Sequence, residues 1–157
     1  MSSAYYSPLV SDDLIWEVAR SQNSYIVKRG NVQFSRDPLN LVNLHSRKHG
    51  GFVNTKAVGI SPAEGDKGGV TIVTKKAGNA QRPASASQST INGSKSNRKT
   101  YKSVANTVAK GYRGDLRAAA VSRASAIRKS QRAVKERQPN APRGVKAKKA
   151  AAAAEEN

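Results

Sequence analysis

The side chains with the clearest chemical potential are lysines and arginines that recur along the C-terminal half of the sequence. Residues 114 to 131 read GDLRAAAVSRASAIRKSQ, a helical pattern made almost wholly of Ala, Ser, Lys and Arg. On a helical projection Leu116, Ala120, Ile127 and Val134 share a narrow apolar stripe, whereas the basic side chains point in several directions. Asp115 is the only acid in this stretch, so i,i+4 pairs cannot neutralise the charge. The pattern predicts a polyanion outside the chain as the partner.

Charge is unevenly distributed over the 157 residues, which carry a net charge of +18. Residues 1 to 80 hold ten basic and six acidic residues, whereas residues 81 to 157 hold eighteen and four. The second part has no Trp or Phe and only two Tyr, so we expect it to need a partner to become ordered. A polyphosphate fits best, because each neutralised phosphate releases condensed counterions. A membrane surface would instead require apolar side chains opposite the lysines.

Several function classes are disfavoured by composition. Without cysteine the chain has no disulfides and no thiolate metal sites, which favours an intracellular protein. We find no apolar run near the roughly 20 residues that span a bilayer, and no secretory signal at the N-terminus. We therefore expect no membrane attachment.

Catalytic and metal-ligating patterns are few. His45 and His49 are spaced as two zinc ligands on a helix would be, but Ser46 stands where a metalloprotease has Glu, and no third ligand is near. We favour polar residues of a basic loop over a metal site. Asp12 and Asp13 suit the first turn of a helix better than acid–base catalysis. The sequence predicts no enzyme activity, no metal, no cofactor and no small-molecule substrate.

The N-terminal part predicts a small α+β fold. Ser11 is a suitable N-cap for a helix over residues 12–21. Residues 24–36 predict a hairpin that turns at Gly30-Asn31, and residues 52–63 and 69–76 predict two further strands. One antiparallel sheet of about four short strands with one or two helices on a face is the expected result. The expected core residues are Leu14, Trp16, Tyr25, Val27, Phe34, Phe52, Val58, Ile60, Val70 and Ile72.

Composition predicts a linker and two basic helices after the small domain. Ala, Ser, Gly and Asn dominate residues 78–97, which we interpret as a linker or as an extended arm on a partner. Apolar spacing then predicts two helices, which either pair as a helical hairpin or dock on the open face of the sheet. The Ala- and Lys-rich end is expected to be disordered. The predicted organisation is a variable extension (1–10), an α+β domain (11–80), a linker (81–97), basic helices (98–134) and a tail (135–157).

The type of nucleic acid is left open by these patterns. The sequence has no helix-turn-helix, zinc finger or dimerising heptad for reading DNA, and no aromatic sheet motif for stacking single-stranded bases. The remaining mode of binding is contact with the backbone of the nucleic acid, guided by the shape of that nucleic acid. It is typical of proteins that stabilise a large folded RNA or package DNA.

Four stretches resemble a known family, in the same order and with similar gaps: DLIWEVARSQNSYIVKR, NTKAVGISPA, GVTIVTKKAG followed by QRPA, and DLRAAAVSRASAIRKSQ. They are similar to the eukaryotic large-subunit (60S) ribosomal protein L28e family, which is distinct from bacterial L28. The resemblance covers about residues 11–134. It implies an α+β domain, C-terminal helices that reach into ribosomal RNA, and a position near eukaryote-specific rRNA expansion segments. It also implies neighbouring ribosomal proteins as partners, and the cytosolic ribosome as location, with nucleolar passage during assembly.

Residues 1–10 and the Ala/Lys-rich tail have no counterpart in this family. Three alternatives stand beside it. The N-terminal domain also resembles that of a nucleolar 60S assembly factor. The tail is similar in composition to linker histones, which would suggest a chromatin protein, and an enzyme that uses His45 and His49 on RNA is the third alternative.

The predicted contacts to rRNA phosphates are the basic residues of the two helices, of the strand ends and of the linker. They are Lys28, Arg29, Arg47, Lys48, Lys75, Lys76, Arg82, Arg98, Lys99, Lys102, Arg113, Arg117, Arg123, Arg128, Lys129 and Arg132.

Overall fold

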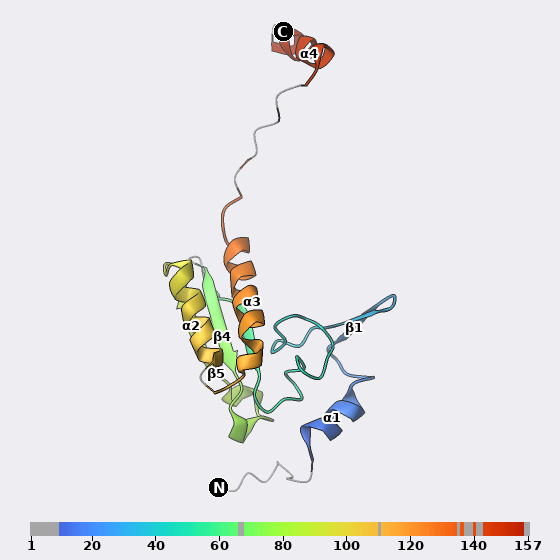
Figure 1. Cartoon of the computed structure of the whole chain (residues 1–157), viewed down its shortest axis with the longest axis vertical. Helices are drawn as coiled ribbons and strands as arrows, with labels where there is room; N and C mark the ends of the chain where they lie inside the picture. The colour runs from blue at the N-terminus through green and yellow to red at the C-terminus, as the bar shows by residue number, and fades with distance from the viewer. Residues whose placement is uncertain are drawn as a thin grey trace.

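The structure is a computed structural model that describes residues 10–65, 68–109, 111–134, 136, 140 and 143–155. The predicted extension lies almost wholly outside the described residues, as do two residues of the predicted β3–β4 turn and part of the tail. Two antiparallel sheets and several helices form an α+β fold, as predicted (Figure 1).

A three-stranded sheet forms the centre, in the order β3 (Val58–Pro62), β4 (Gly69–Thr74) and β5 (Ser87–Asn92). Ile60 pairs with Ile72, and Val70 pairs with Ile91. Because side chains alternate along a strand, these residues share one face of the sheet with Val58. All five are buried, so this face forms half of the core.

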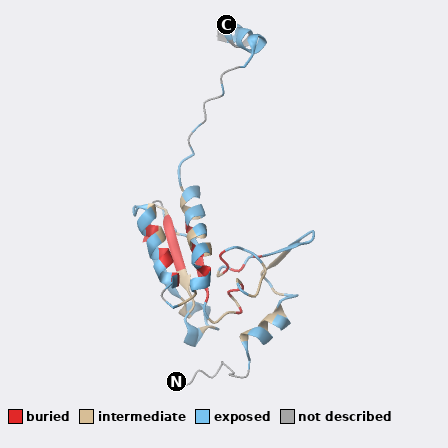
Figure 2. Cartoon of the chain, in the orientation of Figure 1, coloured by how far each residue is buried: buried red, intermediate tan, exposed pale blue. Residues whose placement is uncertain are grey.

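The other half of the core comes from two helices that lie side by side on this face, α2 (Asn97–Ala109) and α3 (Arg117–Ser130) (Figure 1). Val104 and Val108 of α2 are fully buried. Leu116, in the 3₁₀ turn η3 (Gly114–Leu116), is buried together with Ala120 and Ala124 of α3. Figure 2 shows the buried residues on the sides of these elements that face one another.

The apolar stripe of the second basic helix therefore packs on the chain's own sheet. Leu116 is in the core and Ile127 packs against it, whereas Val134 is 93% exposed. Ala120 and Ala124 are small enough for α3 to lie close to its neighbours, so a narrow stripe is sufficient. The two helices form a hairpin that is docked on the sheet, which combines both predicted arrangements. The core includes residues on both sides of position 80.

Residues 87–92 were expected to belong to a linker or to an extended arm on a partner, and both expectations are wrong, because the segment pairs within the chain's own sheet. These residues form β5, which pairs with β4 from Ser87↔Thr74 to Asn92↔Gly69. The strand is SQSTIN, in which Ile91 is the only buried residue. Backbone hydrogen bonds to β4 stabilise this strand. It therefore needs few buried apolar side chains, and its sequence lacks the hydrophobic pattern that would predict a strand. The 3₁₀ turns η1 (Ala77–Asn79) and η2 (Pro83–Ser85) precede it.

The expected single sheet of four strands is also wrong. β1 (Ile26–Arg29) and β2 (Val32–Ser35) form a separate hairpin, which turns as predicted at Gly30, where φ is +54°. Outside this hairpin, the described residues show one isolated antiparallel β-bridge, between Phe34 and Leu44. Asp37 and Pro38 direct the chain into a long loop before β3, so the two sheets stay separate.

Part of the predicted core lies in this N-terminal region and is less buried than expected. α1 (Asp12–Ala19) begins at Ser11, whose hydroxyl accepts a hydrogen bond from Leu14 N at 3.2 Å. Leu14 is 52% exposed and Phe34 is 40% exposed, so both expectations of burial are wrong. Neither α2 nor α3 covers this hairpin.

Smaller aromatic contacts hold the N-terminal region together. The Phe52 ring lies 6.5 Å from Trp16 and 6.0 Å from Tyr25, measured between ring centroids. These three residues and Val27 are half-buried, whereas Val58, Ile60, Val70 and Ile72 are buried as predicted.

The tail contains a helix, α4 (Val145–Glu155), where disorder was expected. Alanine has the highest helix propensity, and five consecutive alanines lie in this segment. The side chains of α4 that can be described are exposed (Figure 2). The helix therefore rests on local propensity.

Candidate nucleic-acid interface

The outer surface of the two docked helices carries exposed cations. Because the apolar residues of α2 and α3 face the sheet, most of their basic residues face outward. Six of these cations are exposed and, within the described residues, have side chains that make no hydrogen bond or ion pair. They are Arg98, Lys99 and Lys102 on α2, Arg117 and Lys129 on α3, and Arg132 just after it.

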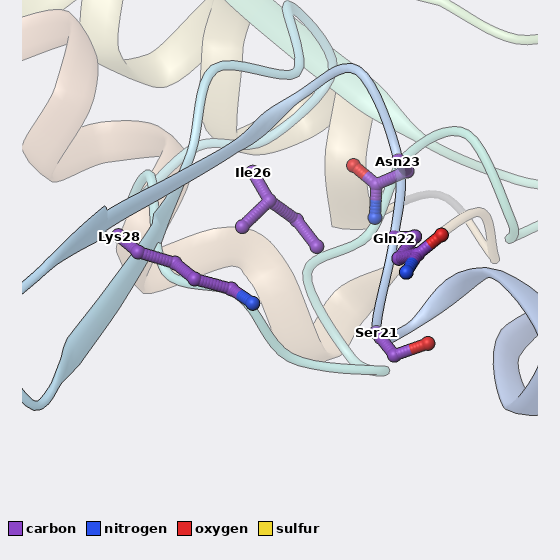
Figure 3. A pocket seen from close by; sticks show the side chains of 5 residues that line it. All are labelled: Ser21, Gln22, Asn23, Ile26 and Lys28. Carbon is purple, nitrogen blue, oxygen red and sulfur yellow. The ribbon is translucent and has the colours of Figure 1, made fainter.

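Five further predicted residues are exposed elsewhere on the surface and likewise lack a side-chain partner among the described residues: Lys28, Arg29, Lys48, Lys76 and Arg82. Lys28 and Ile26 of β1 face the loop residues Ser21, Gln22 and Asn23 across an open hollow of about 610 Å³ (Figure 3). The cations at this hairpin lie away from the α2–α3 surface in the fold (Figure 1).

The other five predicted residues are only partly exposed and make contacts within the chain: Arg47, Lys75, Arg113, Arg123 and Arg128. Arg47 pairs with Asp13 at 2.9 Å and donates to Asn54 Oδ1 at 2.6 Å. Arg123 Nη1 lies 3.4 Å from Asn43 Oδ1, a long contact. Their first role in the structure is to hold loops in place.

Lys75 is the clearest case of an internal cation. Its ammonium donates to the carbonyl oxygens of Gly51, Phe52 and Asn54 at 2.9, 3.3 and 2.9 Å. An ammonium has three donors, so these contacts use all of them. Burial lowers the pKa of Lys75, and the negative charges of Asp37 and Asp12 oppose this effect. Lys75 and the exposed Lys76 beside it cannot be told apart from the sequence.

The turn between α2 and α3 is fixed to the loop before β3 by Arg113. Its guanidinium donates to the carbonyls of Lys56 and Lys48, both at 3.0 Å, and binds Asp115 through two hydrogen bonds of 2.8 Å. The hydrogen bond from Arg113 lowers the pKa of Asp115. Asp115 lies in η3 and orients the Arg113 guanidinium.

Tyr112 supports the same junction. Its hydroxyl accepts a hydrogen bond from Ala57 N at 3.1 Å and donates to the carbonyl of Lys75. Burial raises the pKa of this hydroxyl, and its hydrogen bonds oppose the shift. The ammonium of Lys56 lies 6.0 Å from the Tyr112 ring centroid. Tyr112 and Arg113 thus bind the loop before β3 from the α2–α3 turn, and Arg113 contacts the carbonyls of the exposed Lys48 and Lys56.

Lys56, Arg36 and Lys95 are exposed cations that sequence reasoning missed. Lys56 and Arg36 are isolated in the sequence, and Lys95 lies just before the predicted cluster at Arg98 and Lys99. The neighbours of Lys56 in the fold are Tyr112 and the Arg113 guanidinium that binds its carbonyl.

The two histidines have partners of their own. His45 Nε2 lies 2.8 Å from the carbonyl of Arg20, and its ring lies 5.0 Å from Trp16. His49 Nδ1 lies 2.8 Å from Ser46 Oγ. Burial, followed by the charges of Lys48 and Arg113, lowers the pKa of His49. Over the described ranges, no group of three or more His, Cys, Asp or Glu residues could hold a metal ion.

The acids of the folded part are largely used within the chain. Asp13 pairs with Arg47, Glu17 with Arg20, and Asp115 with Arg113. Asp12 and Asp37 accept hydrogen bonds from backbone N–H groups. The exposed cations of the helix surface are therefore not neutralised by these acids, so that surface suits a polyanion.

No helix in the described part of the chain is long and apolar enough to cross a membrane.

Comparison with known proteins gives a consistent family. The model of the ribosomal L28e protein family matches residues 14–130. Large ribosomal subunit protein eL28 of Schizosaccharomyces pombe is 43% identical over 127 residues, which cover 78% of this chain and 94% of that protein. The proteins of the same name from Dictyostelium discoideum and Trypanosoma cruzi are 28% and 38% identical, over 80% and 44% of this chain and 92% and 47% of their own lengths.

Proposed function

The chain belongs to the ribosomal L28e protein family, and from this premise we propose that it is a structural constituent of the eukaryotic large ribosomal subunit that binds ribosomal RNA through backbone phosphates. The observation that carries the proposal is the set of exposed cations on the outer faces of α2 and α3. Helices that are fixed on a sheet hold these charges at constant spacing. Contacts of this kind position a protein on folded RNA without reading its sequence.

The proposed phosphate contacts are the exposed members of the predicted set, joined by Lys56. Arg47, Lys75 and Arg113 support this surface from within, because their donors bind other parts of the chain. Other proposed partners are eukaryote-specific rRNA expansion segments and neighbouring ribosomal proteins. The proposed location is the cytosolic ribosome, reached after assembly in the nucleolus. We propose no catalytic activity.

A charge-reversal pair tests this proposal. One variant changes Lys99, Lys102 and Lys129 to Glu on the helix surface. The matched control changes three lysines of α4 to Glu, namely Lys146, Lys148 and Lys149, which alters the net charge by the same amount. Each lost phosphate contact reduces the slope of log affinity against log salt by about 0.9 for a duplex. Because the helix variant loses such contacts and places negative charge in their position, its affinity for rRNA should fall and it should fail to enter the subunit.

Both variants are expressed with a tag beside the native protein, and their incorporation is measured across a sucrose gradient. Circular dichroism checks that both fold. The expected result is exclusion of the helix variant and normal incorporation of the α4 variant. Equal incorporation of both would reject the helix surface as the RNA contact.

A further inference from the structure

A polar pocket of about 590 Å³ lies at one end of the sheet, where the β3–β4 turn, the β5–α2 turn and the C-terminal end of α3 meet. This volume is within the range of small-molecule sites in proteins. Lysines and arginines on the helix faces do not require such a hollow, because phosphate contacts form on open surfaces. The residues that matter for its chemistry are Pro62, Ala63, Asn97, Arg128, Gln131 and Arg132.

The pocket wall is held by hydrogen bonds between distant segments. Gly69 N donates to Gln131 Oε1 at 3.0 Å, and Gln131 Nε2 donates to Gly69 O at 2.7 Å. This pair joins the residue that ends α3 to the first residue of β4. Gly93 N also donates to Gly68 O at 3.1 Å, which joins the two turns. The wall is therefore formed before any ligand binds.

Hydrogen bonds within the chain orient the Arg128 guanidinium but do not use all of its N–H donors. Its Nε donates to Asn97 Oδ1 at 3.0 Å, and its Nη2 donates to the carbonyls of Gly93 and Lys95 at 2.9 and 3.2 Å. Within the described residues, Nη1 has no partner, so two N–H donors are left. Because the guanidinium is already fixed, binding would cost little side-chain entropy.

Two further groups at the pocket carry N–H donors that could bind a ligand. Arg132 lies about one helical turn beyond Arg128, is exposed, and has no side-chain partner in the part of the chain that the structure describes. Asn97 uses its Oδ1 to accept from Arg128, and among the described residues its Nδ2 has no acceptor. Two cations and an amide that all donate select a ligand with several anionic oxygens, and phosphate is that ligand in a nucleic acid.

The C-terminal end of a helix carries a partial negative charge and would repel an anion. The charges of Arg128, Lys129 and Arg132 exceed it, and they lie where the helix dipole favours cations. A phosphate alone would leave most of the pocket empty. Pro62 and Ala63 form an apolar part of the lining, against which the flat face of a base can pack.

We propose that this pocket binds one unpaired nucleotide of the RNA, with its phosphate on Arg128 Nη1 and Arg132 and its base against Pro62 and Ala63. The inference rests on the proposed function, because it names the RNA element that one part of the surface takes. An unpaired nucleotide fits, since a base within a helix would first have to leave its stack.

The first test places a photocrosslinking residue in the pocket, as Ala63→p-azidophenylalanine, in native large subunits. A second position on the exposed helix surface, Lys102→p-azidophenylalanine, reports general RNA contact. Crosslinked nucleotides are identified by primer extension. We expect both positions to crosslink rRNA, and the Ala63 crosslink to fall on a nucleotide without a base-pairing partner.

The outcomes separate the two claims. Crosslinks from position 102 but not from 63, or from 63 to a base-paired nucleotide or a polypeptide, would overturn the pocket inference and leave the proposed function standing. Crosslinks to RNA from neither position would overturn both.

A second measurement covers the case in which the bulky residue at position 63 prevents incorporation. Subunits with Arg132→Ala are compared with subunits carrying Lys129→Ala, which removes the same charge from the same helix end but not from the pocket. Loss of the Arg132 contact should weaken local binding about tenfold or more. We expect chemical probing to show one unpaired nucleotide that becomes reactive with Arg132→Ala and stays protected with Lys129→Ala. The same reactivity pattern in both variants would overturn the inference.

Discussion

Lys75 and Lys76 are adjacent lysines for which the structure predicts opposite mutant phenotypes. The Lys75 ammonium binds the carbonyls of Gly51, Phe52 and Asn54, whereas Lys76 is exposed and has no side-chain partner among the described residues. We consider Lys75→Met and Lys76→Met, since methionine keeps most of the apolar stem and removes the charge. Each substitution lowers the net charge by one.

The cost of Lys75→Met follows from the three hydrogen bonds. A hydrogen bond to a charged group contributes about 1.5–3 kcal/mol, and the loss is partly recovered where water reaches the carbonyls. Gly51 is buried, whereas Phe52 and Asn54 are half-buried, so we expect incomplete recovery. The result is a loss of about 2–4 kcal/mol in the free energy of unfolding, which for a domain of this size lowers Tm by roughly 10 °C.

The assays are thermal unfolding by circular dichroism and the salt dependence of binding to purified large-subunit rRNA. Lys75→Met should lower Tm and leave the salt slope unchanged below its unfolding temperature. Lys76→Met should keep Tm and reduce the slope by about 0.7–0.9 if it loses one phosphate contact. A Tm for Lys75→Met within a degree or two of the parent would refute the assignment of Lys75 as an internal residue.

Two further predictions concern stability. The hydrogen bond from Arg113 lowers the pKa of Asp115, so its stabilising effect is present above the ordinary pKa of 3.8 and is lost as the pH falls through the folded-state value. Asp115→Asn should therefore cost up to about 1 kcal/mol near neutral pH in urea unfolding, and the difference from the parent should vanish in acid; a difference that does not depend on pH would contradict this. A Cβ at Gly59 would lie 2.5 Å from the carbonyl oxygen of Pro38, so Gly59→Ala should cost about 1–3 kcal/mol. Gly78→Ala, with no atom within 4 Å of the added Cβ, is the matched control and should unfold like the parent; equal Tm values for both variants would argue against close packing of the loop on β3.

The helices α1, α2 and α3 and most strands could be predicted because their signals are local. Gly30-Asn31 marked the β1–β2 turn, and the spacing of Val104 and Val108 marked α2. The sequence left open whether α3 packs against α2 or against the sheet, and Ala124 beside the predicted stripe read as a neutral residue. Its burial depends on the sheet that lies opposite it.

β5 and the internal cations could not be predicted, because both depend on contacts between residues that are far apart in the sequence. β5 is a strand because β4 lies beside it, and its Ser, Gln and Thr side chains gave no sign of this. The exposed and internal cations likewise look the same in the sequence. Arg113 and Arg117 are both arginines near the start of one helix, but only the fold places the carbonyls of Lys48 and Lys56 against Arg113.

Sedimentation of the tagged full-length protein from a cell lysate, with and without ribonuclease at low salt, tests the central proposal most directly. A structural constituent of the large subunit should migrate with the 60S, 80S and polysome fractions and leave them after ribonuclease treatment. Restriction to nucleolar precursors of the large subunit would indicate an assembly factor instead. Absence from all ribosomal fractions, or association with DNA that survives ribonuclease, would contradict the account.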